Sequence, residues 1–80
     1  MKREEIFEKL NEIFREVFED DSIEVVETTS AADIEDWDSL THITLVSAVE
    51  EEFDIKFSMK DVIGMKNVGE MVDIIMEDME

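Results

Sequence analysis

Apolar residues recur at intervals of three and four in three separate segments of this chain, and no other feature limits its fold as strongly. Such spacing places the apolar side chains of each segment on one face of a helix. The residues on these faces are Ile6, Leu10, Ile13, Phe14 and Val17 in segment 2–18, widened by Phe7 and Phe18, then Leu45, Val46, Val49 and Phe53 in segment 39–53, and Val68, Met71, Val72, Ile75 and Met79 in the last segment. The spacing therefore predicts three helices that bury these faces against one another.

Two polar motifs mark helix starts in the second half of the chain. Ser58 and Asp61 have the form of a capping box, in which two residues three positions apart bond each other's backbone amides. The short helix that begins there is expected to end at Gly64, a residue type well suited to terminate it. Asn67 and Glu70 repeat the capping arrangement before the last helix.

Residues 19–38 form a long connection between the first two helices. A loop of this length in a small domain is either functional or disordered. Its apolar residues are expected to anchor it to the core: Ile23, Val25, Val26 and Ile34. A short strand over residues 23–26 is an alternative, but no second strand is evident to pair with it. Trp37, the only tryptophan, is expected to cover the end of the core rather than to stack on a ligand.

Size and composition limit how this fold can be stabilised. The 80 residues make one domain, residues 1–80, which buries only roughly 60 to 65% of the surface that the unfolded chain exposes. The chain has no cysteine, and its only histidine, His42, has no cysteine or second histidine with which to share a structural zinc site. Helix packing must supply the stability. The predicted fold is all-α: a four-helix bundle with three longer helices, one short third helix and a long loop between helices 1 and 2.

The charge of the chain is strongly negative and unevenly distributed. The formal net charge is -17, and no lysine or arginine occurs between Arg15 and Lys56. A surface of this kind repels a phosphate backbone, so nucleic-acid binding is excluded. The acidic middle favours basic partners steered toward it. A solvated acidic surface that serves only solubility is an equally good interpretation of the charge alone.

No apolar run approaches the roughly 18 residues of a membrane span. The start of the chain leads into an amphipathic pattern and not into the apolar core of a signal peptide. We therefore expect no membrane span, a cytoplasmic location and a monomer.

Ser39 stands where the long acidic loop meets the second predicted helix. Asp38 is expected to cap this helix, which leaves Ser39 at the first helical position with its hydroxyl directed outward. A phosphate ester there would meet unsatisfied amides and the positive end of the helix dipole. Leu40 and Ile43 fall outside the buried stripe and would be partly exposed beside Ser39, as a docking spot would require. On these residues alone, simple helix capping is the favoured explanation of Asp38 and Ser39.

Two other kinds of site are poorly supported. Ser39 and His42 are three residues apart on a helix, as in a hydrolase dyad, but no nucleophile elbow or orienting third group is evident. The cluster Asp33, Glu35, Asp36 and Asp38 suggests calcium binding. A calcium loop counted from Asp33 would need glycine at Asp38 and glutamate at Thr44. We expect no catalytic residue and no metal site.

The chain resembles the acyl carrier proteins, small acidic four-helix domains that carry a 4'-phosphopantetheine arm on the serine of an Asp-Ser-Leu motif. The resemblance covers nearly the whole chain. It rests on three blocks: Trp37-Asp38-Ser39-Leu40-Thr41-His42-Ile43, then Val49-Glu50-Glu51-Glu52-Phe53-Asp54-Ile55-Lys56-Phe57, and Lys66-Asn67-Val68-Gly69-Glu70. It implies a protein that carries acyl intermediates as thioesters and performs no catalysis itself.

The resemblance also implies roles for individual residues. Ser39 would be the modified residue, with Asp38 and Leu40 as its flanking signature. Ile43 and Glu50 would meet basic docking patches on partners, which are a phosphopantetheinyl transferase and acyl-loading and acyl-processing enzymes. Residues expected to line a space that shelters the acyl chain are Val49, Phe57, Val62 and Met65.

Some positions depart from the family pattern. Asp36 and Trp37 stand where family members usually have a glycine before the serine. Ala31 and Ala32 are small, and the third helix is surrounded by positive charge from Lys56, Lys60 and Lys66. These departures favour a specialised or secondary-metabolism carrier in fatty-acid, polyketide or related biosynthesis. The alternatives are a peptidyl or aryl carrier of non-ribosomal synthesis and an unmodified acidic protein-interaction module.

Overall fold

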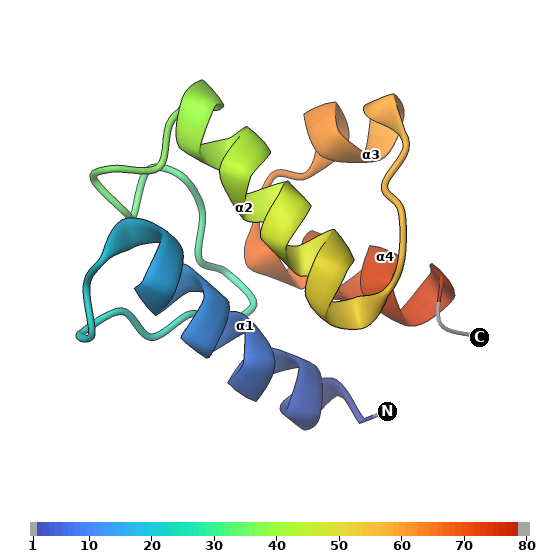
Figure 1. The fold of residues 1–80 in the computed structure, drawn as a ribbon, viewed down its shortest axis with the longest axis horizontal. Coiled ribbons are helices and arrows are strands. Elements are labelled where there is room, and N and C mark those ends of the chain that lie inside the picture. The colour runs from blue at the N-terminus through green and yellow to red at the C-terminus, as the bar shows by residue number, and fades with distance from the viewer. Residues whose placement is uncertain (1, 79–80) are drawn as a thin grey trace.

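The structure, a computed structural model, describes residues 2–78 and is helical (Figure 1). Its elements are α1 (Arg3–Phe18), α2 (Ser39–Phe53), α3 (Met59–Gly64) and α4 (Val68–Asp78). This confirms the predicted class, with three longer helices and one short third helix. Within residues 2–78 the secondary structure contains no strand, so residues 23–26 are loop. Met79, expected on the buried face of the last helix, lies outside the described residues.

The core lies where α1 packs against α2 and α4. Its fully buried side chains are those that the helical spacing selected: Ile6, Leu10, Phe14, Leu45, Val49, Val68, Met71, Val72 and Ile75. At the end of α1 the burial differs from the prediction, because Phe18 is buried and Val17 is only half-buried. Phe18 packs against Phe14 and Trp37, with ring centroids 5.8 and 6.4 Å apart, and this aromatic contact draws the last turn inward.

Side chains of α1 hold the first part of the α1–α2 loop. Asn11 Oδ1 accepts a hydrogen bond from the backbone N–H of Val25 at 2.6 Å, and the Val25 side chain is buried. Ile23 and Ile34 are half-buried against the core, as predicted. The expectation for Val26 was wrong, because 54% of this residue is exposed. Asn11 fixes Val25 toward the core, so the next side chain points away from it.

The middle of the loop is bound to the start of α4. Thr29 C=O accepts a hydrogen bond from Val68 N–H at 2.8 Å, and Glu27 C=O accepts one from Gly69 N–H at 3.0 Å. A Cβ atom at Gly69 would lie 2.8 Å from Glu27 C=O, closer than real Cβ contacts allow. Gly69 therefore permits the close approach of two backbones that are far apart in sequence.

Arg3 joins three segments at the other side of this contact. Its guanidinium donates hydrogen bonds to the carboxylates of Glu27 and Asp73 and to the C=O of Gly69. The hydrogen bonds to Glu27 and Asp73 raise the pKa of Arg3 above its already high ordinary value. The start of α1, the loop and α4 are thus connected through one side chain.

The helix ends combine expected and unexpected features. Ser58 and Asp61 form the predicted capping box at the start of α3, and Asn67 Oδ1 accepts the N–H of Glu70 at 2.9 Å at the start of α4. Gly64 is the last residue of α3 but has no left-handed backbone, so it does not terminate the helix in the expected way. Within residues 2–78 the left-handed residues are Glu19 (φ 52°) and Asp54 (φ 53°), which follow α1 and α2.

No helix within residues 2–78 is long and apolar enough to cross a membrane.

Candidate functional site

Ser39 is the first residue of α2 and is exposed to solvent. Asp38 caps the helix, as predicted: its carboxylate accepts the N–H groups of Leu40 and Thr41, both at 3.0 Å. These bonds, that from Thr41 above all, hold the pKa of Asp38 below its ordinary value. Thr41 completes a capping box, because its Oγ1 accepts a hydrogen bond from the N–H of Asp38 at 2.8 Å. The sequence signal for this second half of the capping box is a hydroxyl three residues after Asp38.

One detail of the expected environment of Ser39 needs correction. Because Asp38 already occupies the amides of Leu40 and Thr41, a phosphate ester on Ser39 would not find those two N–H groups free. What remains favourable is the positive end of the α2 dipole, which lies beside the hydroxyl. Ser39 is also exposed to solvent, so its hydroxyl is accessible to another protein.

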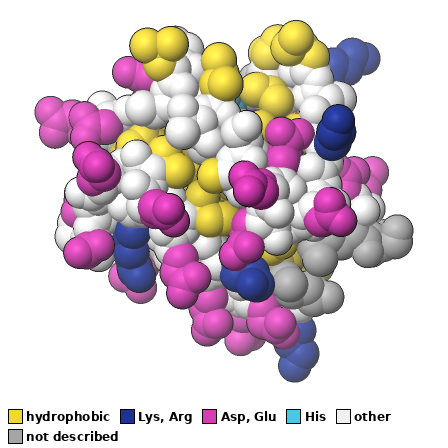
Figure 2. Space-filling view, in the orientation of Figure 1, with side chains coloured by type: hydrophobic (Ala, Val, Ile, Leu, Met, Phe, Trp, Pro, Cys, Tyr) yellow, Lys and Arg dark blue, Asp and Glu magenta, His cyan; other side chains and the backbone are white. Residues whose placement is uncertain are grey.

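Exposed apolar side chains gather beside Ser39 on α2 and across from it on α3. Leu40 and Ile43 are 78% and 65% exposed, as the position outside the buried stripe predicted. Met59 and Ile63 of α3 are 76% and 77% exposed and complete what we call the apolar rim. Figure 2 shows hydrophobic side chains over the start of α2 and over α3, with acidic groups covering much of the same face below them. Met59 and Ile63 were missed because a six-residue helix is too short to show a stripe.

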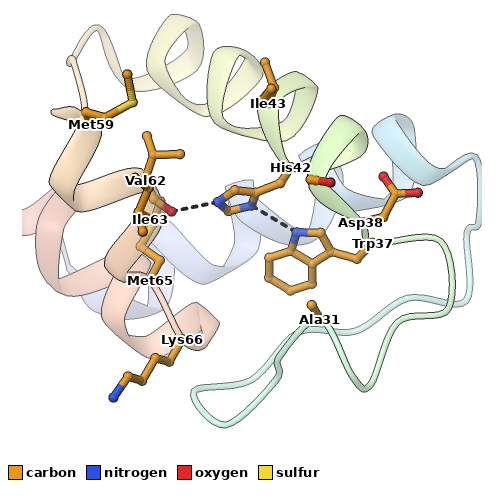
Figure 3. Close-up of a pocket in the computed structure, with 11 residues that line it drawn as sticks. Ala31, Trp37, Asp38, His42, Ile43, Met59, Val62, Ile63, Met65 and Lys66 are labelled. Carbon is orange, nitrogen blue, oxygen red and sulfur yellow. Dashed lines mark hydrogen bonds between the residues drawn. The ribbon is translucent and has the colours of Figure 1, made fainter.

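A pocket of about 530 Å³ opens between α2, α3 and the end of the loop (Figure 3). Ser39 and Asp38 line it together with Ile43 of the apolar rim. Its other walls come from the loop, α2 and the α3 region: Ala31, Trp37, His42, Met59, Val62, Ile63, Met65 and Lys66. The site therefore joins an exposed hydroxyl to a mostly apolar hollow of a size typical for small-molecule ligands.

The residues expected to line an acyl cavity are divided by the structure. Val62 and Met65 line this pocket, whereas Val49 and Phe57 do not. Val49 shares the α2 face of Leu45, which points into the core, and it has no exposed surface. Phe57 is half-buried against the core from the α2–α3 linker. The side of α2 that faces the pocket belongs to Ser39, His42 and Ile43 instead.

Glu50, expected at a docking surface, also has a structural contact. Its Oε2 accepts the backbone N–H of Phe57 at 2.8 Å and so holds the α2–α3 linker against α2. The residue is half-buried. Part of its hydrogen-bonding capacity is therefore used within the protein.

His42 forms a bridge that the sequence did not predict (Figure 3). The indole N–H of Trp37 lies 3.0 Å from His42 Nδ1, and His42 Nε2 lies 3.1 Å from Val62 C=O. Since an indole can only donate and a carbonyl can only accept, Nδ1 is unprotonated and Nε2 carries the hydrogen. Val62 C=O is among the last carbonyls of α3, which have no partner inside the helix. His42 therefore terminates α3 from outside, the function expected of Gly64.

Trp37 is buried and has two roles. Its ring meets Phe14 edge to face, with centroids 5.3 Å apart, so it covers the end of the core as predicted. The same ring is a wall of the pocket. The histidine that it holds has both ring nitrogens engaged, by Trp37 and Val62, which leaves neither to activate Ser39. The geometry thus does not support a Ser39–His42 dyad.

Across residues 2–78 no group of three or more histidine, aspartate or glutamate side chains is arranged to hold a metal ion. In the acidic loop, Asp33 instead accepts the N–H of Ser30 at 3.0 Å, and Asp38 caps α2. These carboxylates stabilise local turns.

Comparisons with known proteins agree on one family. A family model described as "Phosphopantetheine attachment site" matches residues 8–75. The chain is 36% identical over 75 residues to an acyl carrier protein of Acidothermus cellulolyticus, covering 94% of this chain and 89% of the relative. It is 40% identical over 73 residues to an acyl carrier protein of Streptococcus thermophilus, covering 90% and 93%. The solution structure of a holo acyl carrier protein from Geobacter metallireducens superposes with a TM-score of 0.86 at 41% identity, covering 91% and 84%.

The site fits such a prosthetic group. An arm attached to an exposed serine at a helix start would leave its phosphate in solvent beside the helix dipole and could place the rest along the apolar pocket. From the matched family model and the identity over almost the full chain, the chain belongs to the acyl carrier proteins, which are carriers and not enzymes and whose prosthetic group is covalently bound phosphopantetheine.

Proposed function

We propose that Ser39 carries the 4'-phosphopantetheine arm and that the apolar rim and acidic α2 present its thioester cargo to partner enzymes. The observation that carries this assignment is the position of Ser39: it is an exposed residue at the start of a capped helix, and it lines the pocket. Two other exposed serine hydroxyls are engaged within the protein. Ser22 Oγ donates to Asp20 at 2.6 Å, and Ser58 Oγ accepts the capping N–H of Asp61.

In this step the chain contributes the nucleophile, and the transferase contributes the general base. Ser39 Oγ would attack the β-phosphorus of coenzyme A, forming the Oγ–P bond while the diphosphate bridge breaks and adenosine 3',5'-bisphosphate leaves. The proton of Ser39 has to be taken by the transferase, because both nitrogens of the nearby His42 are engaged. The transferase also supplies Mg²⁺. The attached arm ends in the thiol that forms the thioester.

Partner recognition would combine charge and apolar contact. Glu51 and Glu52 are exposed on α2, and Leu40 and Ile43 project beside the arm. Basic patches on a transferase and on acyl-loading and acyl-processing enzymes would be steered toward this face, and such association weakens as salt screens the charges. Lys56, Lys60 and Lys66 are exposed around α3, which supports partners with a mixed charge pattern and a specialised pathway.

Intact-mass spectrometry tests the attachment. The protein is incubated with coenzyme A, Mg²⁺ and a phosphopantetheinyl transferase, and the mass is measured for wild type, Ser39→Ala and Ser47→Ala. Ser47 is exposed on the same helix and is the matched control. Wild type and Ser47→Ala should gain the arm, and Ser39→Ala should not. No gain in wild type, or a gain that persists in Ser39→Ala, would refute the proposal.

A further inference from the structure

The pocket beside Ser39 has a hydrogen-bonded inner wall. Figure 3 shows the His42 ring between the indole of Trp37 and the carbonyl of Val62, so the bridge spans from the loop through α2 to α3. A chain that passed from the pocket between α2 and α3 toward the core would have to separate these groups. It would leave the indole N–H, the imidazole and the carbonyl without partners in an apolar surrounding.

The core residues of the same elements do not reach this pocket. Leu45 of α2 and Val68 and Met71 of α4 have no exposed surface and do not line it, and no buried side-chain polar atom within residues 2–78 lacks a partner. Trp37 is itself fixed by its edge-to-face contact with Phe14. Displacing the wall would therefore disturb both a hydrogen-bonded bridge and an aromatic cluster.

We propose that His42 is a specificity-determining residue that closes the Ser39 pocket against the core, so that this carrier takes short acyl cargo. Short acyl groups remain in the surface pocket, and long alkyl chains are not drawn between α2 and α3. This inference rests on the proposed attachment at Ser39. Because His42 acts on the space available to the cargo and not on attachment, its substitution should change cargo protection without changing loading.

The bridge is first tested on the unmodified chain by ¹⁵N NMR of the imidazole at neutral pH. We expect Nδ1 without hydrogen and Nε2 with hydrogen, as the partners Trp37 and Val62 require. Trp37→Phe, which keeps a ring but removes the donor, should shift the Nδ1 resonance. A hydrogen on Nδ1 in wild type would overturn the proposal.

The cargo limit is tested by loading acyl-pantetheine arms from acetyl to decanoyl with a transferase and measuring thioester cleavage by hydroxylamine. In wild type, the rate of thioester cleavage, divided by the rate for the same thioester on free pantetheine, should not fall as the acyl chain becomes longer. In His42→Ala the decanoyl thioester should react about tenfold more slowly than in wild type, since burial of a pair of methylene groups favours a sheltered state by about that factor. Ser47→Ala, an exposed α2 residue outside the pocket and the bridge, should behave as wild type.

Two results would overturn the inference: protection that grows with chain length in wild type, or equal rates for wild type and His42→Ala across the series. If His42→Ala does not fold, amide shifts of loaded wild type decide the question. A decanoyl arm should then shift Ile43 and Met59 at the pocket and leave Leu45 and Val68 unchanged, and shifts in the core would refute the proposal. Failure of the arm to load at all would instead refute the attachment at Ser39.

Discussion

Replacing Gly69 with alanine places a methyl group against the backbone contact that binds the α1–α2 loop to α4. The new Cβ would lie 2.8 Å from Glu27 C=O and 3.3 Å from Asn67 Oδ1. The first neighbour is backbone and cannot rotate away. Gly64→Ala is the matched control, because a Cβ there meets nothing within 4 Å and the residue has no left-handed backbone.

The two substitutions should change the free energy of unfolding in opposite directions. At Gly69 the overpacking costs about 1–3 kcal/mol, and the strained Gly69–Glu27 hydrogen bond costs about 1 kcal/mol more. The higher helix propensity of alanine returns at most about 1 kcal/mol, so a net loss of about 1–3 kcal/mol is expected. At Gly64 only the propensity acts, which predicts a gain of about 0.5–1 kcal/mol.

Urea unfolding followed by far-UV circular dichroism measures both effects. The midpoint should fall for Gly69→Ala and rise for Gly64→Ala, with unchanged slopes. Hydrogen exchange at the Val68 and Gly69 amides should also increase in Gly69→Ala, since these amides bond the loop. If both variants shifted the midpoint in the same direction and by the same amount, the proposed close contact at Gly69 would be wrong.

Three further predictions concern the ends of α2 and its acidic face. The N–H groups that Asp38 caps lower its pKa, so the stability that the cap contributes is present above the unfolded-state pKa and is lost as pH falls through the folded-state pKa. NMR titration of Asp38 should give a midpoint below the ordinary 3.8. A midpoint at or above that value would contradict the cap. Asp54→Gly should increase the free energy of unfolding by up to about 1 kcal/mol and so raise the urea midpoint, because φ is 53° at this position and glycine adopts this left-handed backbone without strain. A loss of stability would contradict the strain. Glu50→Gln keeps an acceptor for Phe57 N–H but removes a charge, so transferase association at low salt should slow while the unfolding midpoint stays constant. Glu50→Ala should lower both the association rate and the unfolding midpoint. Identical behaviour of the two variants would show that Glu50 does not serve both docking and the linker contact.

The helices could be predicted because their signals are local. Over the lengths of α1, α2 and α4, a three-and-four spacing accumulates enough apolar residues to define a face, and capping motifs lie within four residues of the helix that they start. The path of the α1–α2 loop could not be predicted, since it depends on contacts such as Asn11 with Val25 and Glu27 with Gly69. Those partners carry no pattern that relates them in sequence.

The site divides in the same way. Asp38 and the exposed Leu40 follow from position in a helix, and both were predicted. The bridge from His42 to Val62 joins residues 20 apart through a backbone carbonyl, which has no sequence signature. The cavity role of Val49 stays a prediction, since this residue is buried and does not line the pocket beside Ser39. A helix face can be assigned from spacing, but which neighbour that face meets is decided by the whole packing.

Trp37 gives this protein a built-in optical probe. It is the only tryptophan, its ring contacts Phe14 of the core edge to face, and it forms a wall of the pocket beside Ser39. Its indole hydrogen-bonds to a histidine that also contacts α3. Cargo that settles in the pocket or moves α3 must therefore alter the surroundings of a single fluorophore. Intrinsic emission can follow loading and delivery in real time without an attached label.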